Sequence, residues 1–389
     1  MAQACLTVNK LNILSTITTL ILCLTISVGT STLSAQTQDV QAPVAQAQQQ
    51  QAGQPQEPQP AERVIATEPY IPATEAPQQN AAHTKAAGGN VSMAGHQINF
   101  PRDPKDDLDV LKMQIFLDYH GFSVGQIDGQ WGYNTGRGIY QFQKFHGIPP
   151  TGQMDDSMLD LLAKFDKGYL VEYSVTSKDV KGPFYTIPRS YAAMSKLKAL
   201  PYESALEGLG EKFHCAQSLL RKLNPGVNLD NIAAGTKILA PNVVNGFDET
   251  KGKVGKVRVS KNNKWIEVYD TAGQFMYFYP CTLGSPRDPL PLGTYSVVGV
   301  QENPHYSYNP SLFWDSKPGE QPCTLAPGPN GPVGDLWIGT SRKSLGIHGT
   351  PNPEAISRNN SHGCIRLCNW DVHQLGKRVE VGTKLEFVE

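Results

Sequence analysis

Apolar and polar residues alternate with a period of two in the C-terminal part of the chain, from Lys253 onward. Such alternation is typical of strands that bury one face. It occurs in the segments 257–259, 265–269, 274–280, 293–300, 337–338 and 385–388. A helical spacing follows Asn369, which we expect to be the N-cap of the helix. The pattern predicts a mainly β domain with few helices over residues 253–389.

Upstream, residues 103–166 predict a compact unit of three short helices. The first helix is indicated by the spacing of Val110, Met113 and Leu117, and Gly121 stands where its C-cap is expected. Thr135 is the expected N-cap of the second helix. The third is indicated by the apolar residues Met158, Leu159 and Leu162.

Residues 183–243 give weaker signals. The segment Tyr185–Pro188 is compatible with a short strand, and 205–213 and 216–223 are compatible with two helices. A second strand is expected in Gly235–Pro241. The predicted order is strand, helix, helix, strand.

Residues 301–335, which we call the cover segment, lie between predicted strands and are rich in proline and aromatic residues, among them Tyr306, Tyr308, Phe313 and Trp314. A long irregular segment inside a compact domain is often a lid or a binding loop. We therefore expect it to lie over a substrate cleft. A solvated insertion is the alternative.

The N-terminus has the features of an export signal. Lys10 precedes an apolar run from Leu11 to Val28, and small residues lead to Ala35, after which cleavage is expected. This predicts a signal peptide over 1–35 and a protein exported to the periplasm or cell wall. An uncleaved membrane anchor is the alternative, because the run is about as long as a bilayer span. Residues 36–95 are rich in Gln, Ala and Pro, which predicts a disordered linker.

Composition adds a constraint on partners and on cysteine chemistry. A formal net charge of −1 over 389 residues gives no indication of nucleic-acid binding. In an exported protein the cysteines beyond the signal would meet an oxidising compartment. Their odd number permits two disulfides and one free thiol; they are Cys215, Cys281, Cys323, Cys364 and Cys368. We expect Cys364 to be free and Cys281 to pair with Cys323.

Cys364 is the strongest candidate for chemistry. It lies in the motif Ser361-His362-Gly363-Cys364-Ile365-Arg366, and a second histidine, His348, stands upstream before Gly349. A thiol attacks as the thiolate, so a cysteine nucleophile needs a base or a cation near its sulfur. Glycine next to each histidine lets backbone N–H groups approach a substrate and hold the oxyanion of an acyl-transfer intermediate.

These motifs resemble the catalytic signature of the L,D-transpeptidases, the YkuD-type domain: a histidine, a spacer and then [S/T]-H-G-C. Flanking motifs occur in the same order, namely Pro291–Tyr295, Gly339–Ser341 and Asn369–Asp371. The resemblance covers about residues 253–389 and implies a mainly β, sandwich-like YkuD fold. It also implies an enzyme of cell-wall biogenesis that joins peptidoglycan stem peptides through a cysteine acyl-enzyme. We expect a single chain with no metal or organic cofactor.

Both upstream segments resemble cell-wall modules. Residues 103–166 are similar to the three-helix peptidoglycan-binding module in a pattern that includes Met113-Gln114, Asp128-Gly129 and Thr151-Gly152. Residues 183–243 are similar to LysM, a small glycan-binding βααβ fold, in Leu223-Asn224-Pro225 and Gly235–Pro241. The usual Gly-Asp-Thr after the first LysM strand is missing, and a spacer that binds nothing is the alternative. The two likenesses imply peptidoglycan as the partner.

The resemblance also implies roles for single residues. Cys364 is the nucleophile, His348 is the base, and the carbonyl of Gly349 orients the imidazole. Carbapenem-type β-lactams are expected to acylate Cys364.

Other residues of the motif have supporting roles by the same resemblance. The amides of Gly363 and Cys364 are expected to hold the oxyanion, Ser361 to fix the turn, and His362 to shape the acceptor side or the oxyanion hole. Arg366 is expected to pair with a substrate carboxylate, or else to form a structural ion pair.

Several alternatives stay open at this point. An L,D-carboxypeptidase or endopeptidase would use the same Cys-His site with water as acceptor. Other possible acceptors are a second diaminopimelate amine, a lysine of an envelope protein or a free D-amino acid. A non-catalytic wall-binding scaffold is a further alternative. A zinc hydrolase would use His348, His362, Cys364 and His373, although the chain has no C-x-x-C or H-E-x-x-H pair.

Overall fold

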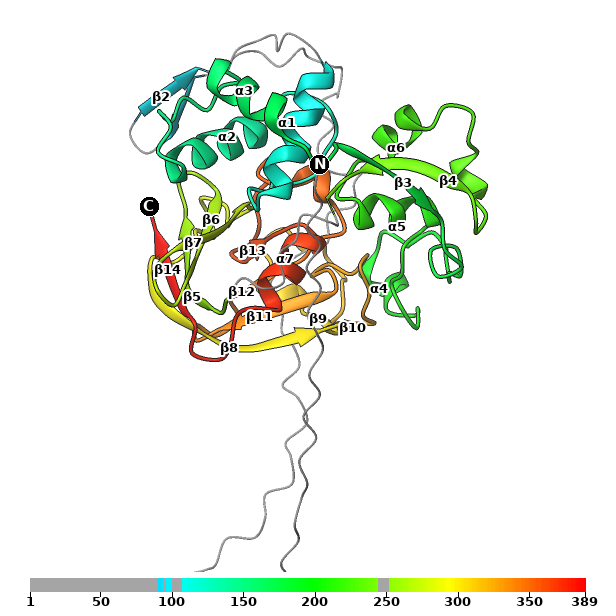
Figure 1. The fold of residues 1–389 in the computed structure, drawn as a ribbon. Helices are drawn as coiled ribbons and strands as arrows, with labels where there is room; N and C mark the ends of the chain where they lie inside the picture. The colour runs from blue at the N-terminus through cyan, green and yellow to red at the C-terminus, as the bar shows by residue number, and fades with distance from the viewer. Residues whose placement is uncertain (1–89, 94–95, 100–106, 244–251) are drawn as a thin grey trace, which may run out of the picture. The chain divides into compact units, whose positions relative to one another are not determined.

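The computed structural model describes residues 90–93, 96–99, 107–243 and 252–389, all within one compact unit, Pro60–Glu389 (Figure 1). The predicted signal peptide and most of the predicted linker lie outside the described residues. Residues 90–93, which composition assigned to the linker, form β1 (Asn90–Met93), and β1 pairs antiparallel with β2 (His96–Asn99). In the described part of the chain, no helix is long and apolar enough to cross a membrane.

The three predicted helices of the upstream module are confirmed as α1 (Asp107–Tyr119), α2 (Tyr133–Phe145) and α3 (Asp156–Lys164). The prediction that Thr135 caps α2 is wrong, because the N-cap position belongs to Gly132. Thr135 lies buried inside the first turn, where its hydroxyl accepts a hydrogen bond from Gln114 Nε2 at 3.2 Å. That side chain therefore joins α2 to α1 and does not cap α2.

In the segment that follows this module, three α-helices and one 3-10 helix lie between two paired strands, where two helices were predicted. Its elements are β3 (Leu170–Ser174), α4 (Tyr191–Met194), α5 (Ala205–Lys212), α6 (Gln217–Leu223), η1 (Leu229–Asn231) and β4 (Lys237–Pro241). The predicted strand at Tyr185–Pro188 is wrong, because β4 pairs antiparallel with β3 instead. The amide of Ile187 donates to the Glu203 carboxylate at 2.6 Å, so a side chain takes the place of a ladder partner.

The C-terminal part is mainly β, as predicted, and eight of its strands form one sheet (Figure 1). The strands are β5 (Val254–Ser260), β6 (Trp265–Asp270), β7 (Phe275–Pro280), β8 (Gly293–Glu302), β11 (Leu336–Thr340), β12 (Gly346–His348), β13 (Ile365–Arg366) and β14 (Lys384–Val388). Their order in the sheet is β13-β12-β11-β8-β14-β5-β6-β7. Helix α7 (Asn369–Gly376) follows β13. Its N-cap is Cys368 and not Asn369, so Asn369 is the first residue within the helix.

Two hydrophobic clusters bury opposite faces of the β11–β13 region. Ile338, Ile347 and Ile365 point into the larger cluster, which also contains Leu385 and Phe387. Trp337 points the other way, into a cluster that contains Cys364. Successive residues of a strand point to opposite faces, so this split follows from the period-two pattern.

The cover segment is more regular than predicted. It contains β9 (Tyr306–Tyr308), η2 (Pro310–Leu312) and β10 (Cys323–Leu325), and β9 pairs antiparallel with β10. Tyr306, Tyr308, Phe313 and Leu325 are buried in the same cluster as Cys364. Residues from the neighbourhood of α4 complete that cluster, namely Ile187, Met194 and Leu200. The segment is therefore a packed hairpin and not a solvated insertion.

The three-helix module packs on the edge of the sheet at β7. The amide of Ser123 donates to Phe278 O at 2.9 Å, and the amide of Phe278 donates to Gly121 O at 2.9 Å. The rings of Phe145 and Phe275 stack with centroids 3.8 Å apart. An exposed strand edge is prone to pairing with other chains, and these contacts cover it.

The predicted Cys281–Cys323 disulfide is wrong, because every cysteine in the described ranges is free. Cys281 belongs to the larger sheet cluster, whereas Cys323 packs against the cluster under the cover segment. The two thiols therefore belong to different cores. Cys364 is free, as expected.

Candidate active site

Three short strands bring the predicted site residues to one face of the sheet. His348 is the last residue of β12, and it pairs with Trp337 of β11 on one side and with Arg366 of β13 on the other. The isoleucines next to these residues fill the larger core on the opposite face. Cys364 lies two residues before Arg366 and belongs to the cluster under the cover segment. Strand alternation thus directs His348 and Cys364 to the same side.

The imidazole of His348 is fully buried and has a defined orientation. Its Nδ1 lies 2.7 Å from the carbonyl oxygen of Gly349. A carbonyl oxygen only accepts hydrogen bonds, so Nδ1 carries a proton and Nε2 is the basic nitrogen of the neutral ring. The indole of Trp337 stacks on the imidazole with centroids 5.4 Å apart.

Ser361 holds the turn that leads to Cys364. Its amide donates to Leu283 O at 2.8 Å, and its hydroxyl donates to Cys364 O at 2.6 Å. The same hydroxyl accepts the Gly363 N–H at 3.1 Å. That Gly363 amide is consequently engaged inside the turn, and the Cys364 amide is the better placed of the two expected oxyanion donors.

Gly363 itself needs to be glycine. Its φ of +128° lies in a region that side chains disfavour, and a Cβ built on it would meet nothing within 4 Å. The space next to the nucleophile turn is therefore open. Cys364 Sγ is buried, and it lies 3.8 Å from Ser344 O.

His362 is bound to the cover segment. Its Nε2 donates to Asp315 Oδ1 at 3.0 Å, and its ring contacts those of Phe313 and Trp314 at 5.5 and 5.4 Å. Trp314 in turn donates from Nε1 to Asp288 Oδ2 at 2.9 Å. His362 therefore connects the motif to the tip of the cover segment, whereas His348 is the histidine oriented within the sheet.

Arg366 is nearly buried beside His348. Its backbone exchanges hydrogen bonds with Thr282 at 2.9 and 3.0 Å, and its side chain lines a small hollow that also contains Thr350 and Asn352. Burial raises the pKa of the nearby Tyr191 phenol well above its usual value, with Tyr306 adding to the effect and the Arg366 guanidinium opposing it. The charge of Arg366 therefore acts on Tyr191, whose ring packs against the cluster that contains Cys364.

The four donors of the zinc alternative are not assembled. His373 lies on α7, where its Nε2 donates to Asp335 Oδ1 at 2.8 Å, and His362 is turned toward Asp315. Among the described residues there is no group of three or more His, Cys, Asp or Glu side chains that could hold a metal ion.

Trp337 and Asp315 are site residues that the sequence did not single out. Trp337 is recognisable once β11 and β12 are paired, because it then stands directly opposite His348. Asp315 gives no signal in the sequence, since its contact with His362 crosses from the cover segment to the motif.

Two parts of the chain match known protein families. Residues 255–387 match the YkuD family, described as the L,D-transpeptidase catalytic domain, and residues 106–162 match a putative peptidoglycan binding domain. These matches confirm two of the three family resemblances. The LysM-like character of residues 183–243 stays a prediction.

Two single relatives are similar to parts of this chain in sequence. The putative L,D-transpeptidase YkuD of Bacillus licheniformis is 29% identical over 180 residues, which is 46% of this chain and 91% of that protein. The probable L,D-transpeptidase YbiS of Escherichia coli is 39% identical over 70 residues, which is 18% of this chain and 22% of that protein. A solved L,D-transpeptidase structure from Xylanimonas cellulosilytica has 15% identity and a TM-score of 0.32, and the match covers 72% of this chain and 92% of that one.

Proposed function

Because this chain carries an L,D-transpeptidase catalytic domain of the YkuD family and a peptidoglycan-binding domain, we propose that it is an L,D-transpeptidase of peptidoglycan stem peptides. The observation that supports this most directly is the geometry around His348. Its Nδ1 is fixed on Gly349 O, it stands on the same face as Cys364, and its Nε2 is left as the basic nitrogen.

The proposed reaction is a transacylation through a thioester. His348 Nε2 takes the proton of the Cys364 thiol, and the sulfur attacks the amide carbonyl that follows the L-centre of diaminopimelate. The tetrahedral oxyanion forms beside the amide of Cys364. The imidazolium then gives its proton to the leaving amine, D-alanine departs, and an acyl group remains on sulfur.

A second amine completes the reaction. It attacks the thioester, loses its proton to His348 and releases Cys364, and a diaminopimelate amine as acceptor gives a 3–3 crosslink. Water as acceptor gives the carboxypeptidase or endopeptidase alternative. Three aromatic residues of the cover segment, Tyr306, Tyr308 and Phe313, are buried in the same cluster as Cys364, which favours an amine over water by limiting solvent at the thioester.

The remaining residues fit supporting roles in this scheme. Arg366 is a nearly buried cation, suited to a carboxylate of the stem peptide. Ser361 and Gly363 shape the turn, and His362 holds the cover segment near the acceptor side. Peptidoglycan is the proposed partner, the three-helix module and the LysM-like segment are the proposed contacts with it, and an envelope protein is a possible acceptor. Because the N-terminal sequence predicts an export signal or a membrane anchor, we propose that the protein is located in the periplasm or cell wall.

The experiment is mass spectrometry of the full chain incubated with tetrapeptide muropeptides of the diaminopimelate type. A dimer one D-alanine lighter than two monomers, absent with Cys364→Ala and with His348→Gln, supports the proposal. Cys323→Ala is the matched control, because Cys323 lies in the cover segment and has no role in the scheme. A carbapenem should add to the same thiol.

The products also separate the alternatives. Tripeptide alone indicates a carboxypeptidase, and cleavage of added dimers indicates an endopeptidase. No product and no carbapenem adduct, with retained binding to purified wall, would support a non-catalytic scaffold.

A further inference from the structure

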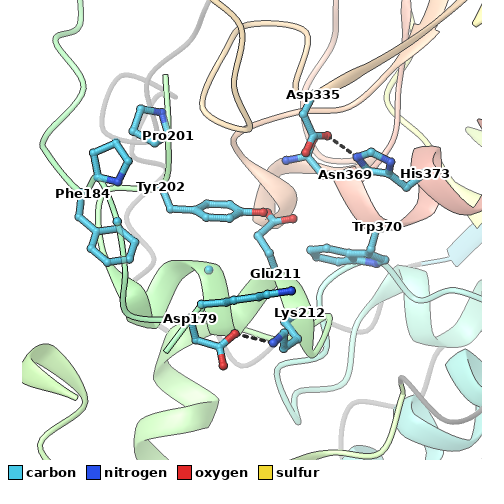
Figure 2. Close-up of a pocket in the computed structure, with 14 residues that line it drawn as sticks. Asp179, Phe184, Pro201, Tyr202, Glu211, Lys212, Asp335, Asn369, Trp370 and His373 are labelled. Carbon is cyan, nitrogen blue, oxygen red and sulfur yellow. Dashed lines mark hydrogen bonds and ion pairs between the residues drawn. The ribbon is translucent and has the colours of Figure 1, made fainter. Parts of the chain in front are cut away.

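A cavity of about 460 Å³ lies between α5 and α7 (Figure 2). Residues between Lys178 and Lys212 form one wall, and Asp335 and residues of α7 form the other. Neither Cys364 nor His348 lines it, so the cavity is separate from the site built around the thiol. Its volume lies within the range of sites that bind small molecules.

The charges in the wall are balanced and mostly paired. The wall contains as many acidic as basic side chains, namely Asp179, Glu211, Asp335, Lys178, Lys212 and His373. Lys212 is ion-paired with Asp179, and His373 Nε2 lies 2.8 Å from Asp335 Oδ1. Lys178 is exposed, so solvent screens its charge. An ionic ligand therefore finds no matching surplus of charge, whereas a neutral ligand with hydroxyl groups finds both donors and acceptors.

Aromatic rings give the same cavity apolar surfaces. Phe184 and Tyr202 come from the first wall and Trp370 comes from α7, and Figure 2 shows Trp370 across the cavity from the other two. A sugar ring carries hydroxyl groups around its edge, and its C–H groups form an apolar face that buries surface when it packs on an aromatic ring. Aromatic faces together with paired charges therefore suit a sugar better than a wholly apolar ligand.

The two walls are fixed to each other by contacts that need no ligand. Asn330 Nδ2 donates to Pro201 O at 3.0 Å and to Glu207 Oε1 at 2.9 Å. The imidazole of His214 stacks on the Trp370 indole, with centroids 5.1 Å apart and an interplanar angle of 8°. A site whose walls are already held in place loses less conformational freedom when a ligand binds.

We propose that this cavity binds a sugar unit of a glycan strand, with Phe184, Tyr202 and Trp370 packing on the sugar and the paired charges bonding to its hydroxyl groups. The choice of the peptidoglycan glycan as the ligand rests on the proposed function. The site combines a segment upstream of the matched catalytic domain with α7, which lies inside it. Glycan binding there would fix the catalytic domain on the strand whose stem peptides it joins.

The test is fluorine NMR of the full chain labelled with fluorotryptophan, in which the Trp370 signal is assigned with Trp370→Phe. One probe is a peptide-free tetrasaccharide of peptidoglycan, and the other is a free stem tetrapeptide. We expect the tetrasaccharide to shift the Trp370 signal saturably and the tetrapeptide to leave it unchanged. The signal of Trp131, which belongs to the three-helix module, reports separately on binding at that module.

Variants of Phe184 test the contact itself. Phe184→Ala should weaken the binding seen at Trp370 by about tenfold, because an aromatic anchor is removed. Phe184→Tyr keeps an aromatic ring and should bind like the parent. Leu239→Ala is the matched control, since Leu239 is an exposed apolar residue of β4 that does not line the cavity. An unchanged Trp337 signal shows that each variant is folded, because Trp337 is buried in the cluster that contains Cys364.

Several results would overturn the proposal. The tetrasaccharide could move the Trp131 signal alone or no signal, or the tetrapeptide could move that of Trp370. Phe184→Ala could bind as tightly as the parent, or Leu239→Ala could lose as much as Phe184→Ala. The binding assay needs no turnover, so a parent that binds the tetrasaccharide at Trp370 and forms no crosslinked product contradicts the proposed function and not the sugar site. Product without any response at Trp370 contradicts the sugar site alone.

Discussion

Trp337 and His348 face each other across the β11–β12 ladder with their rings nearly parallel, at an interplanar angle of 13°. Directly opposed residues on one sheet face interact through their side chains, and a flat aromatic partner restricts the rotation of the imidazole. The ring of His348 is therefore held by a backbone carbonyl at Nδ1 and by an indole on its face.

Replacing the indole of Trp337 should lower the turnover of the enzyme. We expect Trp337→Leu to lower kcat by about tenfold, because a branched side chain gives the imidazole no flat surface. Trp337→Phe, which keeps an aromatic face, should lose less. Steady-state kinetics and urea unfolding of the two variants measure this. Equal turnover of Trp337→Leu and the parent would contradict it.

The packing of the cover segment should depend on Phe313 and not on its neighbour Leu312. Phe313 is buried against Tyr308 and His362, whereas Leu312 is 49% exposed. Phe313→Ala should destabilise the protein by about 3 kcal/mol and raise KM, since a large buried ring is removed from the cluster under the cover segment. Leu312→Ala is the matched control and should change both quantities little. Similar losses in the two variants would refute the assignment of Phe313 as the anchor.

Glu267 should hold the three-helix module to the sheet. It is buried in β6, and its carboxylate accepts from Gln141 Nε2 at 3.1 Å, Lys144 Nζ at 3.2 Å and Arg258 Nη1 at 3.1 Å. Glu267→Ala should lower the free energy of unfolding by about 2 to 3 kcal/mol, because the buried amide of Gln141 loses its acceptor and a buried carboxylate with two cationic partners is removed.

The measurement for Glu267 is guanidinium unfolding followed by tryptophan fluorescence. Glu389→Ala, which removes an exposed carboxylate paired with Lys261, is the control and should cost less than about 1 kcal/mol. The prediction is wrong if the two variants unfold at the same denaturant concentration.

The His373–Asp335 pair should make stability depend on pH. The hydrogen bond from His373 to Asp335 raises the pKa of His373 above its usual value, and burial opposes the shift. A histidine whose pKa is higher in the folded state stabilises that state fully below about pH 6.5, and this contribution is lost as pH rises through the folded pKa. Since the His373 side chain is 35% exposed, we expect no more than about 1 kcal/mol.

The corresponding measurement is urea unfolding of the parent and His373→Gln at about pH 5.5 and about pH 9. The difference between the two proteins should be larger at the lower pH. His305→Gln, which removes an exposed histidine outside this pair, is the matched control. A difference that grows with pH would contradict the assignment.

The sequence predicted the elements whose signals are local. Strand β14 was recognisable because one of its faces is buried, so apolar residues recur at every second position. The helices of the upstream module were recognisable for the same reason at helical spacing. The motif around Cys364 identified the candidate nucleophile, because serine, histidine, glycine and cysteine in this order seldom serve another function.

Caps and short strands were predicted less well, because their choice depends on distant partners. Thr135 is a good N-cap residue by type, yet its hydroxyl bonds to Gln114. Tyr185–Pro188 has strand-like composition, yet Glu203 takes the Ile187 amide and β4 pairs with β3. In each case a distant side chain or strand takes the hydrogen bond that the local pattern had assigned elsewhere. The propensity of a short segment holds no information about such a distant partner.

By itself, then, the sequence determined the mainly β fold and the family, and it supplied the candidate residues of the proposed acyl transfer. Only the tertiary structure decided which contacts those residues make. It engaged the Gly363 amide with Ser361, turned His362 to Asp315 in the cover segment, and packed Asn369 of α7 against Gly349. The reason is physical: burial patterns repeat along the chain, whereas a hydrogen bond between distant segments exists only when folding brings its two partners together.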